Sequence, residues 1–392
     1  DAKINDRLNV SLNLSAYRSR MAAPATGMTS IMYYAFRETP VTPIQFQNGN
    51  YGLFKNEHNS VASARESGLA RTYNNNFQGS ASFTYKIIDR LSLRGNASTT
   101  FNLKDEHTFL RSMKFYTAES VDPIRTTRSE VENKDNKMLE VNLQAYLDYA
   151  KSFGKHDLKG LLGYSQLYNQ YRILGASRKD LPLNNSLGEI NAGDITTQTS
   201  EGNMVEYALR SAFARVNYTF DNRYLLEANI RYDGTSRFPK DNRFGAFPSF
   251  SAGWRVSEES FFTASWIDNL KLRASWGQLG NQEIGDYAFY NTYMFGQNYN
   301  FGNMLYPGIS INEKMANSII TWEKTDQIDI GVDADAFGGK LSFTGDFFVK
   351  NTKDILLELP IPEIVGVKPP MQNAGKVRNT GMEMQISHNN QI

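Results

Sequence analysis

The 392-residue sequence has no cysteine and only four histidines, and its charges nearly cancel to a formal net charge of +1. The lack of cysteine excludes a disulfide framework and thiolate metal sites. The small net charge gives no electrostatic reason to expect a nucleic-acid partner. No stretch approaches the roughly 18 consecutive apolar residues of a membrane helix, which excludes a helical membrane protein.

Residues that could carry catalysis are also scarce. The histidines lie far apart with no partner at ligand spacing, so the sequence predicts neither a zinc site nor a catalytic triad; they are His58, His107, His156 and His388. The glycine-rich segment at residues 277–285 follows a strand into a loop and not into a helix, so we do not expect it to cradle phosphate. We therefore expect no enzyme and no cofactor.

Alternation of apolar and polar residues is the main signal that is present. In residues 224–233, Tyr224, Leu226 and Ile230 fall on one face of an extended strand, whereas Glu227 and Arg231 fall on the other. The same period of two returns in residues 8–16, 77–85, 91–98, 270–276 and 328–333. Hydrophobic residues make up 40% of the chain, yet its mean hydropathy is -0.49, because they are spread through alternating strands. This pattern predicts an all-β, antiparallel transmembrane β-barrel.

Connections between the expected strands alternate in length. Short turns are expected at residues 85–91, 149–156, 220–224 and 336–341, and long loops at residues 18–75, 102–137, 174–203, 278–323 and 351–379. We count roughly a dozen strands of about 9 to 12 residues, which suits a bilayer crossing. A complete barrel of about 12 strands and one piece of a larger barrel both fit. We favour the piece, because residues 382–388 alternate like a strand and nothing resembling a closing strand follows.

Several segments in order resemble the barrel of SusC/RagA-type TonB-dependent transporters of Bacteroidetes. They are RYDGTSRF at residues 231–238, the segments at 242–262, 270–287, 322–337, 341–356 and 373–386, and a proline-containing loop at 33–52. The resemblance implies a barrel of about 22 strands with a plug in its lumen. Residues 1–392 would then be the β-barrel portion, with the N-terminal plug, the TonB-contacting region and the closing strands absent.

Aromatic residues supply the candidate ligand or partner contacts. One group lies in residues 287–301 and includes Tyr287, Phe289, Tyr290, Tyr293, Phe295, Tyr299 and Phe301. A second group, in an earlier loop, contains Tyr33, Tyr34, Phe36 and Phe46. Such rings stack on sugars or peptide side chains and can anchor a protein. Equally, they could pack loops together or return as a membrane-crossing strand.

Charged residues form two further candidate sites. Arg231, Asp233, Arg237, Asp241 and Arg243 cluster near an extracellular strand end, and we prefer a salt-bridge network that fixes loop position to substrate contact. A second set could bind calcium, although same-face carboxylates of a barrel strand usually line a wet lumen; it comprises Asp329, Asp333 and Asp335.

The resemblance implies TonB-dependent import of a large nutrient, an oligosaccharide or oligopeptide, across the bacterial outer membrane. A SusD-type surface lipoprotein would cover the long loops as a lid, TonB would act through the missing N-terminal region, and outer-membrane lipid would surround the barrel. A different hypothesis is a structural scaffold in an outer-membrane assembly or secretion complex, which would keep the same lipid-facing pattern. An outer-membrane hydrolase is the weakest alternative, because no histidine is placed to support it.

Overall fold

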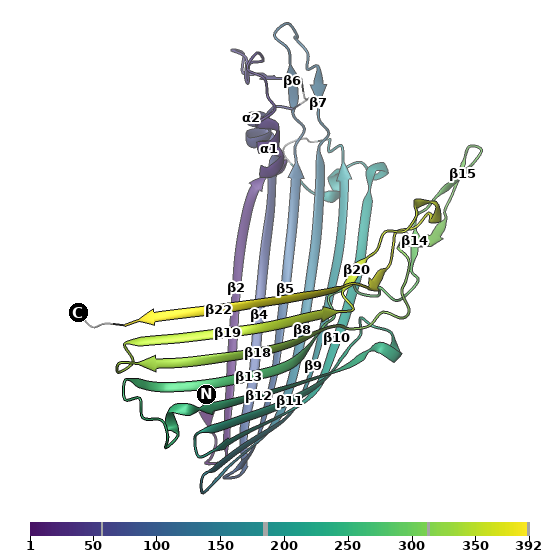
Figure 1. Ribbon diagram of the computed structural model, residues 1–392. Helices are drawn as coiled ribbons and strands as arrows, with labels where there is room; N and C mark the ends of the chain where they lie inside the picture. Colours follow the sequence, from purple (N-terminus) through teal and green to yellow (C-terminus); the bar gives the residue numbers. More distant parts are fainter. Residues whose placement is uncertain (56–57, 183–186, 312–313, 390–392) are drawn as a thin grey trace.

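The computed structural model describes residues 1–55, 58–182, 187–311 and 314–389. A single 13-stranded sheet dominates it, with strand order β1-β2-β4-β5-β8-β9-β10-β11-β12-β13-β18-β19-β22. Every long strand pairs antiparallel with the next long strand along the chain, as Figure 1 shows. The prediction of an all-β antiparallel sheet of roughly a dozen strands is confirmed. The tail at residues 390–392 lies outside the described residues.

Strand length divides the sheet into two halves. The two-residue β1 (Ala2–Lys3) and six long strands come first: β2 (Leu8–Pro24), β4 (Gly68–Ile88), β5 (Leu91–Leu110), β8 (Glu130–Phe153), β9 (His156–Lys179) and β10 (Thr199–Phe220). Six shorter strands follow: β11 (Tyr224–Thr235), β12 (Phe244–Arg255), β13 (Ile267–Asn281), β18 (Glu323–Ala336), β19 (Leu341–Lys353) and β22 (Lys376–His388).

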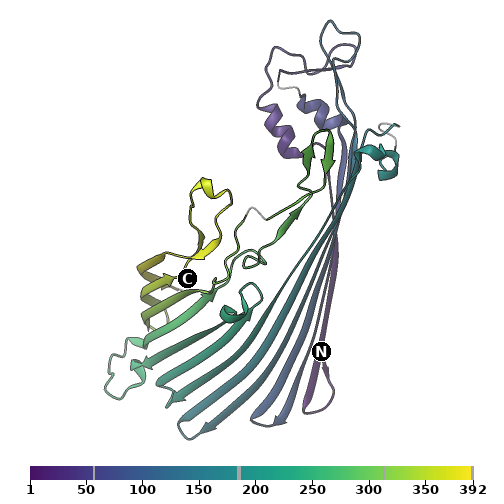
Figure 2. The ribbon, with the colours of Figure 1, turned by 90° about the vertical axis from the view of Figure 1, so that its right-hand side faces the viewer.

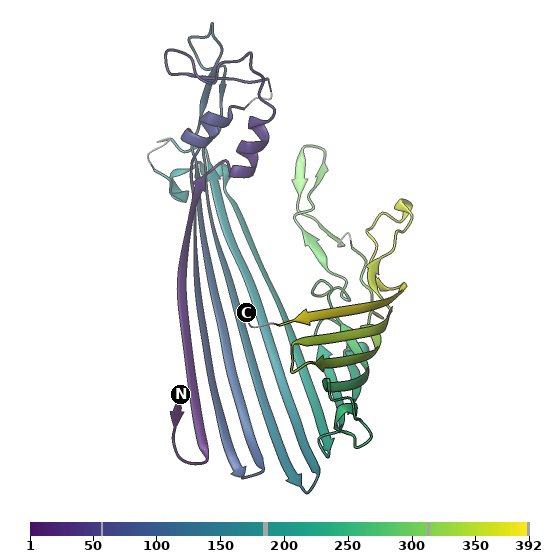
Figure 3. The same ribbon diagram turned by 60° about the vertical axis from the view of Figure 1, so that its left-hand side comes forward.

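The sheet bends into an open trough and does not close on itself. The first long strands and the last short strands lie at opposite margins of this trough (Figures 2 and 3). Within the described residues, β22 pairs with β19 alone, and β2 pairs with β1 and β4. The fold is therefore part of a barrel wall.

The expected strand length of 9 to 12 residues is wrong for the first half of the sheet. The six long strands contain 17 to 24 residues, and the shorter strands 12 to 15. A tilted strand crosses the hydrocarbon in about 9–11 residues, so the long strands continue well beyond the membrane on one side. The predicted loop bounds are too wide for the same reason; the first loop, for example, runs from residue 25 to 67.

The short turns all lie at one end of the sheet, and the turns at residues 221–223 and 337–340 match the prediction. At the other end, the long loops carry small elements: α1 (Met28–Ala35), β3 (Tyr51–Gly52), α2 (Ser60–Glu66), β6 (Lys114–Tyr116), β7 (Arg125–Thr126), β14 (Tyr293–Phe295), β15 (Tyr299–Phe301), β16 (Met304–Tyr306), β17 (Ile309–Ile311), β20 (Leu356–Glu358) and β21 (Met371–Asn373). Short 3-10 helices occur at Ile190–Ala192, Ile195–Thr197, Lys240–Asn242, Val256–Glu258 and Glu363–Val365.

The register gives the wall one apolar face and one polar face. Leu226 lies opposite Ala252 and Tyr218, and these three share the apolar face, whereas Glu227 lies opposite Ser251 and Asn217 on the polar face. Large apolar side chains remain exposed on the first face, including Leu12, Leu14, Phe77, Leu162, Leu226, Ile230, Ile330 and Met384. Hydrocarbon suits that face and water suits the other, so the polar face lines the lumen. No helix in the described ranges is long and apolar enough to cross a membrane.

Candidate functional site

A groove at mid-height of the lumenal face combines aromatic rings with charges of both signs. It has a volume of about 530 Å³ and is lined by Tyr146, Phe213, Arg231, Asp233 and Asn229, among others. These residues come from β8, β10 and β11; β9 lies between β8 and β10, and the register of β10 and β11 places Phe213 opposite Arg231. The groove can therefore contact a ligand through ring faces, a guanidinium and a carboxylate at once.

Contacts within the groove hold its side chains in place. The rings of Tyr146 and Phe213 meet edge to face, with centroids 5.8 Å apart. The Arg231 guanidinium lies 4.8 Å from the centroid of Phe213 and pairs with Asp233 at 3.0 Å. Cation–π contact and ion pairing together orient this guanidinium across the ring. Arg231 keeps half of its side chain exposed to the lumen, so it remains available to a ligand.

A glycine on β9 makes room for the central ring of the groove. Gly163 lies directly opposite Phe213, and a Cβ built at Gly163 would come within 2.2 Å of the Phe213 ring. Only glycine permits that close approach, because any side chain would push the ring out of the groove. The lumenal surface therefore depends on the pair of Gly163 and Phe213.

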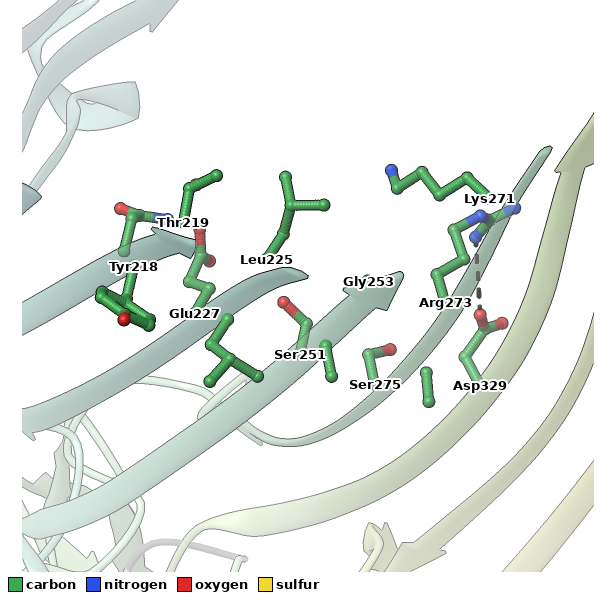
Figure 4. A pocket seen from close by; sticks show the side chains of 14 residues that line it. Tyr218, Thr219, Leu225, Glu227, Ser251, Gly253, Lys271, Arg273, Ser275 and Asp329 are labelled. Atoms are coloured by element: carbon green, nitrogen blue, oxygen red, sulfur yellow. Dashed lines mark hydrogen bonds and ion pairs between the residues drawn. The ribbon is translucent and has the colours of Figure 1, made fainter. Parts of the chain in front are cut away.

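Nearer the short turns, a second lumenal pocket of about 350 Å³ contains a shared ion pair (Figure 4). Figure 4 shows Lys271 and Arg273 pointing to one side of the sheet and Tyr218 to the other. Arg273 meets three carboxylates, at 2.7 Å from Asp346, 3.0 Å from Asp333 and 3.7 Å from Asp329.

This arrangement bears on the calcium hypothesis. Asp329 and Asp333 already face the Arg273 guanidinium, and Asp335 accepts a hydrogen bond from the Asn269 amide at 3.1 Å. Positive charge is thus supplied by the protein itself. Among the described residues, no group of three or more histidine, aspartate or glutamate side chains is arranged to hold a metal ion. Calcium binding remains a hypothesis that the structure does not test.

The predicted charge cluster divides into separate contacts. Arg231 and Asp233 face the lumen as described, whereas Arg237 lies beyond the end of β11 and pairs with Asp286 at 2.9 Å. The Arg243 Nε donates a long hydrogen bond of 3.4 Å to the Phe238 carbonyl, and Asp241 is exposed. The Arg237 pair fixes one loop against another, which is the role the sequence favoured for the whole set.

Arg237 also belongs to a small extracellular pocket of about 210 Å³ beside the edge of β10. Its guanidinium lies 4.5 Å from the centroid of Tyr207, and the pocket is further lined by Tyr287, Phe289 and Tyr290. The Tyr287 hydroxyl accepts a hydrogen bond of 3.2 Å from the backbone N–H of Glu206. The structure thus brings two predicted groups together, the charge cluster and the first part of the aromatic segment.

The aromatic segment has two parts with different environments. Phe289 packs against the buried cluster of Phe238, Phe247, Ile284, Ile320 and Trp322 at the base of the loops. From Tyr293 onward, the chain forms two small hairpins outside the main sheet, in which β14 pairs with β17 and β15 with β16. The alternative of a membrane-crossing strand is therefore wrong.

Exposure along these hairpins is high. Tyr293, Phe295, Tyr299 and Phe301 are 67%, 77%, 64% and 67% exposed. The earlier loop presents Tyr33 and Phe36 on α1, while Tyr34 stacks on His58 with ring centroids 3.8 Å apart. The protruding hairpins therefore offer the larger uncovered aromatic surface, and Tyr34 is engaged inside its own loop.

One extracellular loop, residues 180–198, is joined at its start to the segment before β8 by an ion pair. The Arg128 Nε donates to an oxygen of Asp180 at 2.8 Å, and this guanidinium holds the pKa of Asp180 below its usual 3.8. Hydrogen bonds from the backbone and hydroxyl of Thr196 lower the pKa of Asp194 in the same way. The ionised Asp180 thus joins the start of the loop to the segment before β8, whereas the ionised Asp194 stabilises the short 3-10 helix within the loop.

Sequence reasoning missed Tyr146 and Phe213, the two rings of the lumenal groove. A usable signal exists, because the turn at residues 221–223 sets Phe220 opposite Tyr224. Counting back from that pair places Phe213 opposite Arg231 on the lumenal face. Tyr146 has no comparable local signal, since its contact with Phe213 crosses β9.

Comparison with known proteins supports the architecture. Residues 104–390 match the sequence profile of the family described as TonB dependent receptor-like, beta-barrel. TonB-dependent receptor P3 of Formosa agariphila is 31% identical over 411 residues, covering all of this chain and 39% of the receptor. TonB-dependent receptor SusC of Bacteroides thetaiotaomicron is 32% identical over 263 residues, covering 65% of this chain and 26% of SusC.

Among solved structures, the RagAB peptide importer in its closed-closed state superposes with a TM-score of 0.81. The two chains are 23% identical, and the match covers 98% of this chain and 43% of the importer chain. At this identity the similarity shows a shared fold. The chain spans about two-fifths of the length of the first curated relative. On these matches, the resemblance to SusC/RagA-type barrels is confirmed, and the chain belongs to the TonB-dependent receptor-like β-barrel family of the bacterial outer membrane.

Proposed function

We propose that the chain forms part of the wall of a TonB-dependent importer that takes a large nutrient, an oligopeptide or oligosaccharide, across the outer membrane. The observation that carries this proposal is the lumenal groove of Tyr146, Phe213 and Arg231, which presents rings and a guanidinium along the transport path. An oligomer with polar groups and ring-stacking or apolar faces matches such a lining. The similarity to SusC in sequence and to the RagAB peptide importer in fold supports this proposal.

The open sheet supports a larger assembly. An unpaired strand edge has no hydrogen-bond partner in hydrocarbon, so β22 needs further strands beside it in the membrane. We infer that these strands, a plug and the TonB-contacting region belong to the rest of the protein. A lumen wide enough for an oligomer would leak without a plug, and displacing that plug requires energy from outside the barrel.

The exposed hairpins between β13 and β18 are the surface that we assign to a SusD-type lipoprotein lid. They project from the extracellular end with their tyrosine and phenylalanine rings uncovered. Contiguous exposed aromatic side chains of this kind mark protein contacts more often than they mark free surface.

We further infer that the chain carries no catalytic chemistry and no resident calcium. The histidines of the described chain take part in stacking or in hydrogen bonds with single neighbours, as His156 does with the Tyr218 hydroxyl at 2.7 Å. Arg273 already supplies a positive charge to Asp329 and Asp333 of the acidic row, which supports this inference for calcium. Binding and transport then depend on the groove alone.

Uptake measurements on the full-length protein test the proposal. Arg231→Gln is expected to weaken binding of labelled oligopeptides or oligosaccharides at least about tenfold, because a charged hydrogen bond contributes about 1.5–3 kcal/mol. Phe213→Ala is expected to weaken it about fivefold, because a ring contact contributes about 1 kcal/mol. Arg210→Gln removes the same charge from the outward face of β10, the strand next to that of Arg231, and is the matched control. Unchanged uptake in both groove variants, together with copurification of secretion machinery, would instead favour the scaffold hypothesis.

A further inference from the structure

Three arginines lie on the outward face of β2 and β4, just above the apolar band of the wall. On β2, the outward positions run through Leu12 and Leu14 and then change to Arg18 and Arg20. On β4, Arg71 lies on the same face, opposite Ala22, one rung above the pair of Arg20 and Tyr73. The two strands are adjacent and lead upward into the extracellular loops (Figure 1). The three guanidinium groups are thus placed where hydrocarbon gives way to headgroups.

Two of these guanidinium groups lie over the same tyrosine ring, that of Tyr73. The Arg18 guanidinium carbon lies 4.4 Å from the centroid of the Tyr73 ring, and that of Arg20 lies 5.8 Å from it. Cation–π contact orients a guanidinium without neutralising its charge. All three arginine side chains are exposed, so their N–H groups point into the surroundings.

On the lumenal face, in contrast, two of the cations form ion pairs. Arg94 pairs there with Asp148 at 2.6 Å, and Lys104 pairs with Glu106 at 2.6 Å. Within the part of the chain that the structure describes, Arg18, Arg20 and Arg71 make no ion pair with any carboxylate. The three outward arginines therefore lack ion pairs in the described chain, whereas Arg94 and Lys104 on the lumenal face each have one.

A second place on the outward face shows the same property independently. Lys137 of β8 and Arg172 of β9 lie directly opposite one another, again above the apolar band. Like charges in opposed positions destabilise a sheet unless an anion lies between them. Three outward carboxylates lie near this pair, namely Asp105, Asp135 and Glu206, and none forms an ion pair with either cation among the described residues. Glu206 instead accepts a hydrogen bond from the Tyr168 hydroxyl at 2.7 Å.

We propose that Arg18, Arg20 and Arg71 form a binding site for the phosphate of a lipid headgroup in the outer leaflet. The guanidinium fork matches phosphate oxygens, and an aromatic ring beside it is typical of the interfacial zone. Leu12, Leu14 and Phe77 lie immediately below on the same face and receive the acyl chains of the same lipid. Because headgroup and chains are bound together, a lipid and not free phosphate is the ligand.

Lipid binding to the full-length protein in a neutral detergent tests this site by native mass spectrometry. The probes are phosphatidic acid and lipid A, with phosphatidylcholine and inorganic phosphate as comparisons. We expect the triple variant Arg18→Gln/Arg20→Gln/Arg71→Gln to bind the two anionic lipids, phosphatidic acid and lipid A, at least about tenfold more weakly, since each basic residue contributes to anionic-lipid attraction. Replacing the same three arginines with lysine should restore part of that binding through charge alone.

A matched control removes three exposed arginines from other places, namely Arg7 and Arg90 at the short-turn end and Arg65 in a loop. This control should retain the lipid, and inorganic phosphate should bind neither form. Equal loss in the control would show a general charge effect and overturn the site. Undiminished lipid binding by the first triple variant, or binding of inorganic phosphate in preference to lipid, would overturn it as well.

Discussion

Replacing Arg273 with glutamine tests whether one guanidinium holds the short-strand half of the wall together. Arg273 on β13 pairs with Asp333 on β18 and with Asp346 on β19, and so links three strands on the lumenal side. Without it, the carboxylates of Asp329, Asp333 and Asp346 lose the guanidinium they share, and among the described residues only the long 3.9 Å contact of Lys271 with Asp333 remains. We expect the variant to fold but to be less stable.

The size of the effect follows from exposure. Breaking a fully buried ion pair costs about 3–5 kcal/mol, whereas a fully exposed pair contributes about 0.2–1 kcal/mol. The Arg273 side chain is 30% exposed and its partners 19% to 29%, so water screens part of the interaction. We therefore expect Arg273→Gln to lower the free energy of unfolding by about 2 kcal/mol, between these limits.

Urea unfolding of the full-length protein in detergent, followed by loss of folded mobility on gels, measures this change. Lys271→Gln is the matched control, because Lys271 makes a single long contact of 3.9 Å with Asp333. It should change the free energy by less than about 0.5 kcal/mol. Adding Asp346→Asn to Arg273→Gln should recover part of the loss, since one unpaired carboxylate is removed. An Arg273 variant as stable as the Lys271 variant would refute the reasoning.

Two further predictions concern packing and pH. Gly163→Ala should lower the free energy of unfolding by about 1–3 kcal/mol, because its Cβ would clash with the Phe213 ring. The double variant Gly163→Ala/Phe213→Ala should lose less stability than the sum of the two single variants, and unfolding of all three variants measures this. The pKa of Asp180 is depressed by Arg128, so protection of residues 187–198 should be constant at neutral pH and be lost as pH falls below about 3.8. Amide exchange corrected for its intrinsic pH dependence measures this protection, and Arg128→Gln should abolish the transition. Protection that persists unchanged at pH 2 would contradict the anchoring role of this pair.

Alternation predicted the sheet, its faces and several of its turns, because a bilayer imposes apolar residues at every second position. It failed above the membrane, where Arg18 and Arg20 replace leucine on the outward face and both faces become polar. There, backbone hydrogen bonds to the neighbouring strand maintain the extended conformation. The side chains no longer alternate between apolar and polar, so the sequence does not indicate that the strands continue. Loop bounds drawn from polarity were consequently too wide.

The candidate site was predicted in fragments. Arg231 and Arg237 were grouped because they are close in sequence, yet β11 ends between them at Thr235, so one faces the lumen and the other a loop. Arg237 finds its partner Asp286 49 residues later, across a connection whose path the sequence does not specify. Pairings within one hairpin can be counted from its turn, whereas contacts between loops depend on tertiary folding.

Beyond Leu209 the strand β10 has lost its neighbour β11, and residues 236 and 287 supply the missing backbone partners. The Ser236 hydroxyl accepts from the Ala208 N–H at 2.9 Å, and the Tyr287 hydroxyl from that of Glu206. Ser236 and Tyr287 therefore cover this part of the edge of β10. Their contacts also hinder pairing of that edge with a strand of another molecule. Removal of the Tyr287 hydroxyl would leave the Glu206 N–H without this partner, on a strand margin open to another strand.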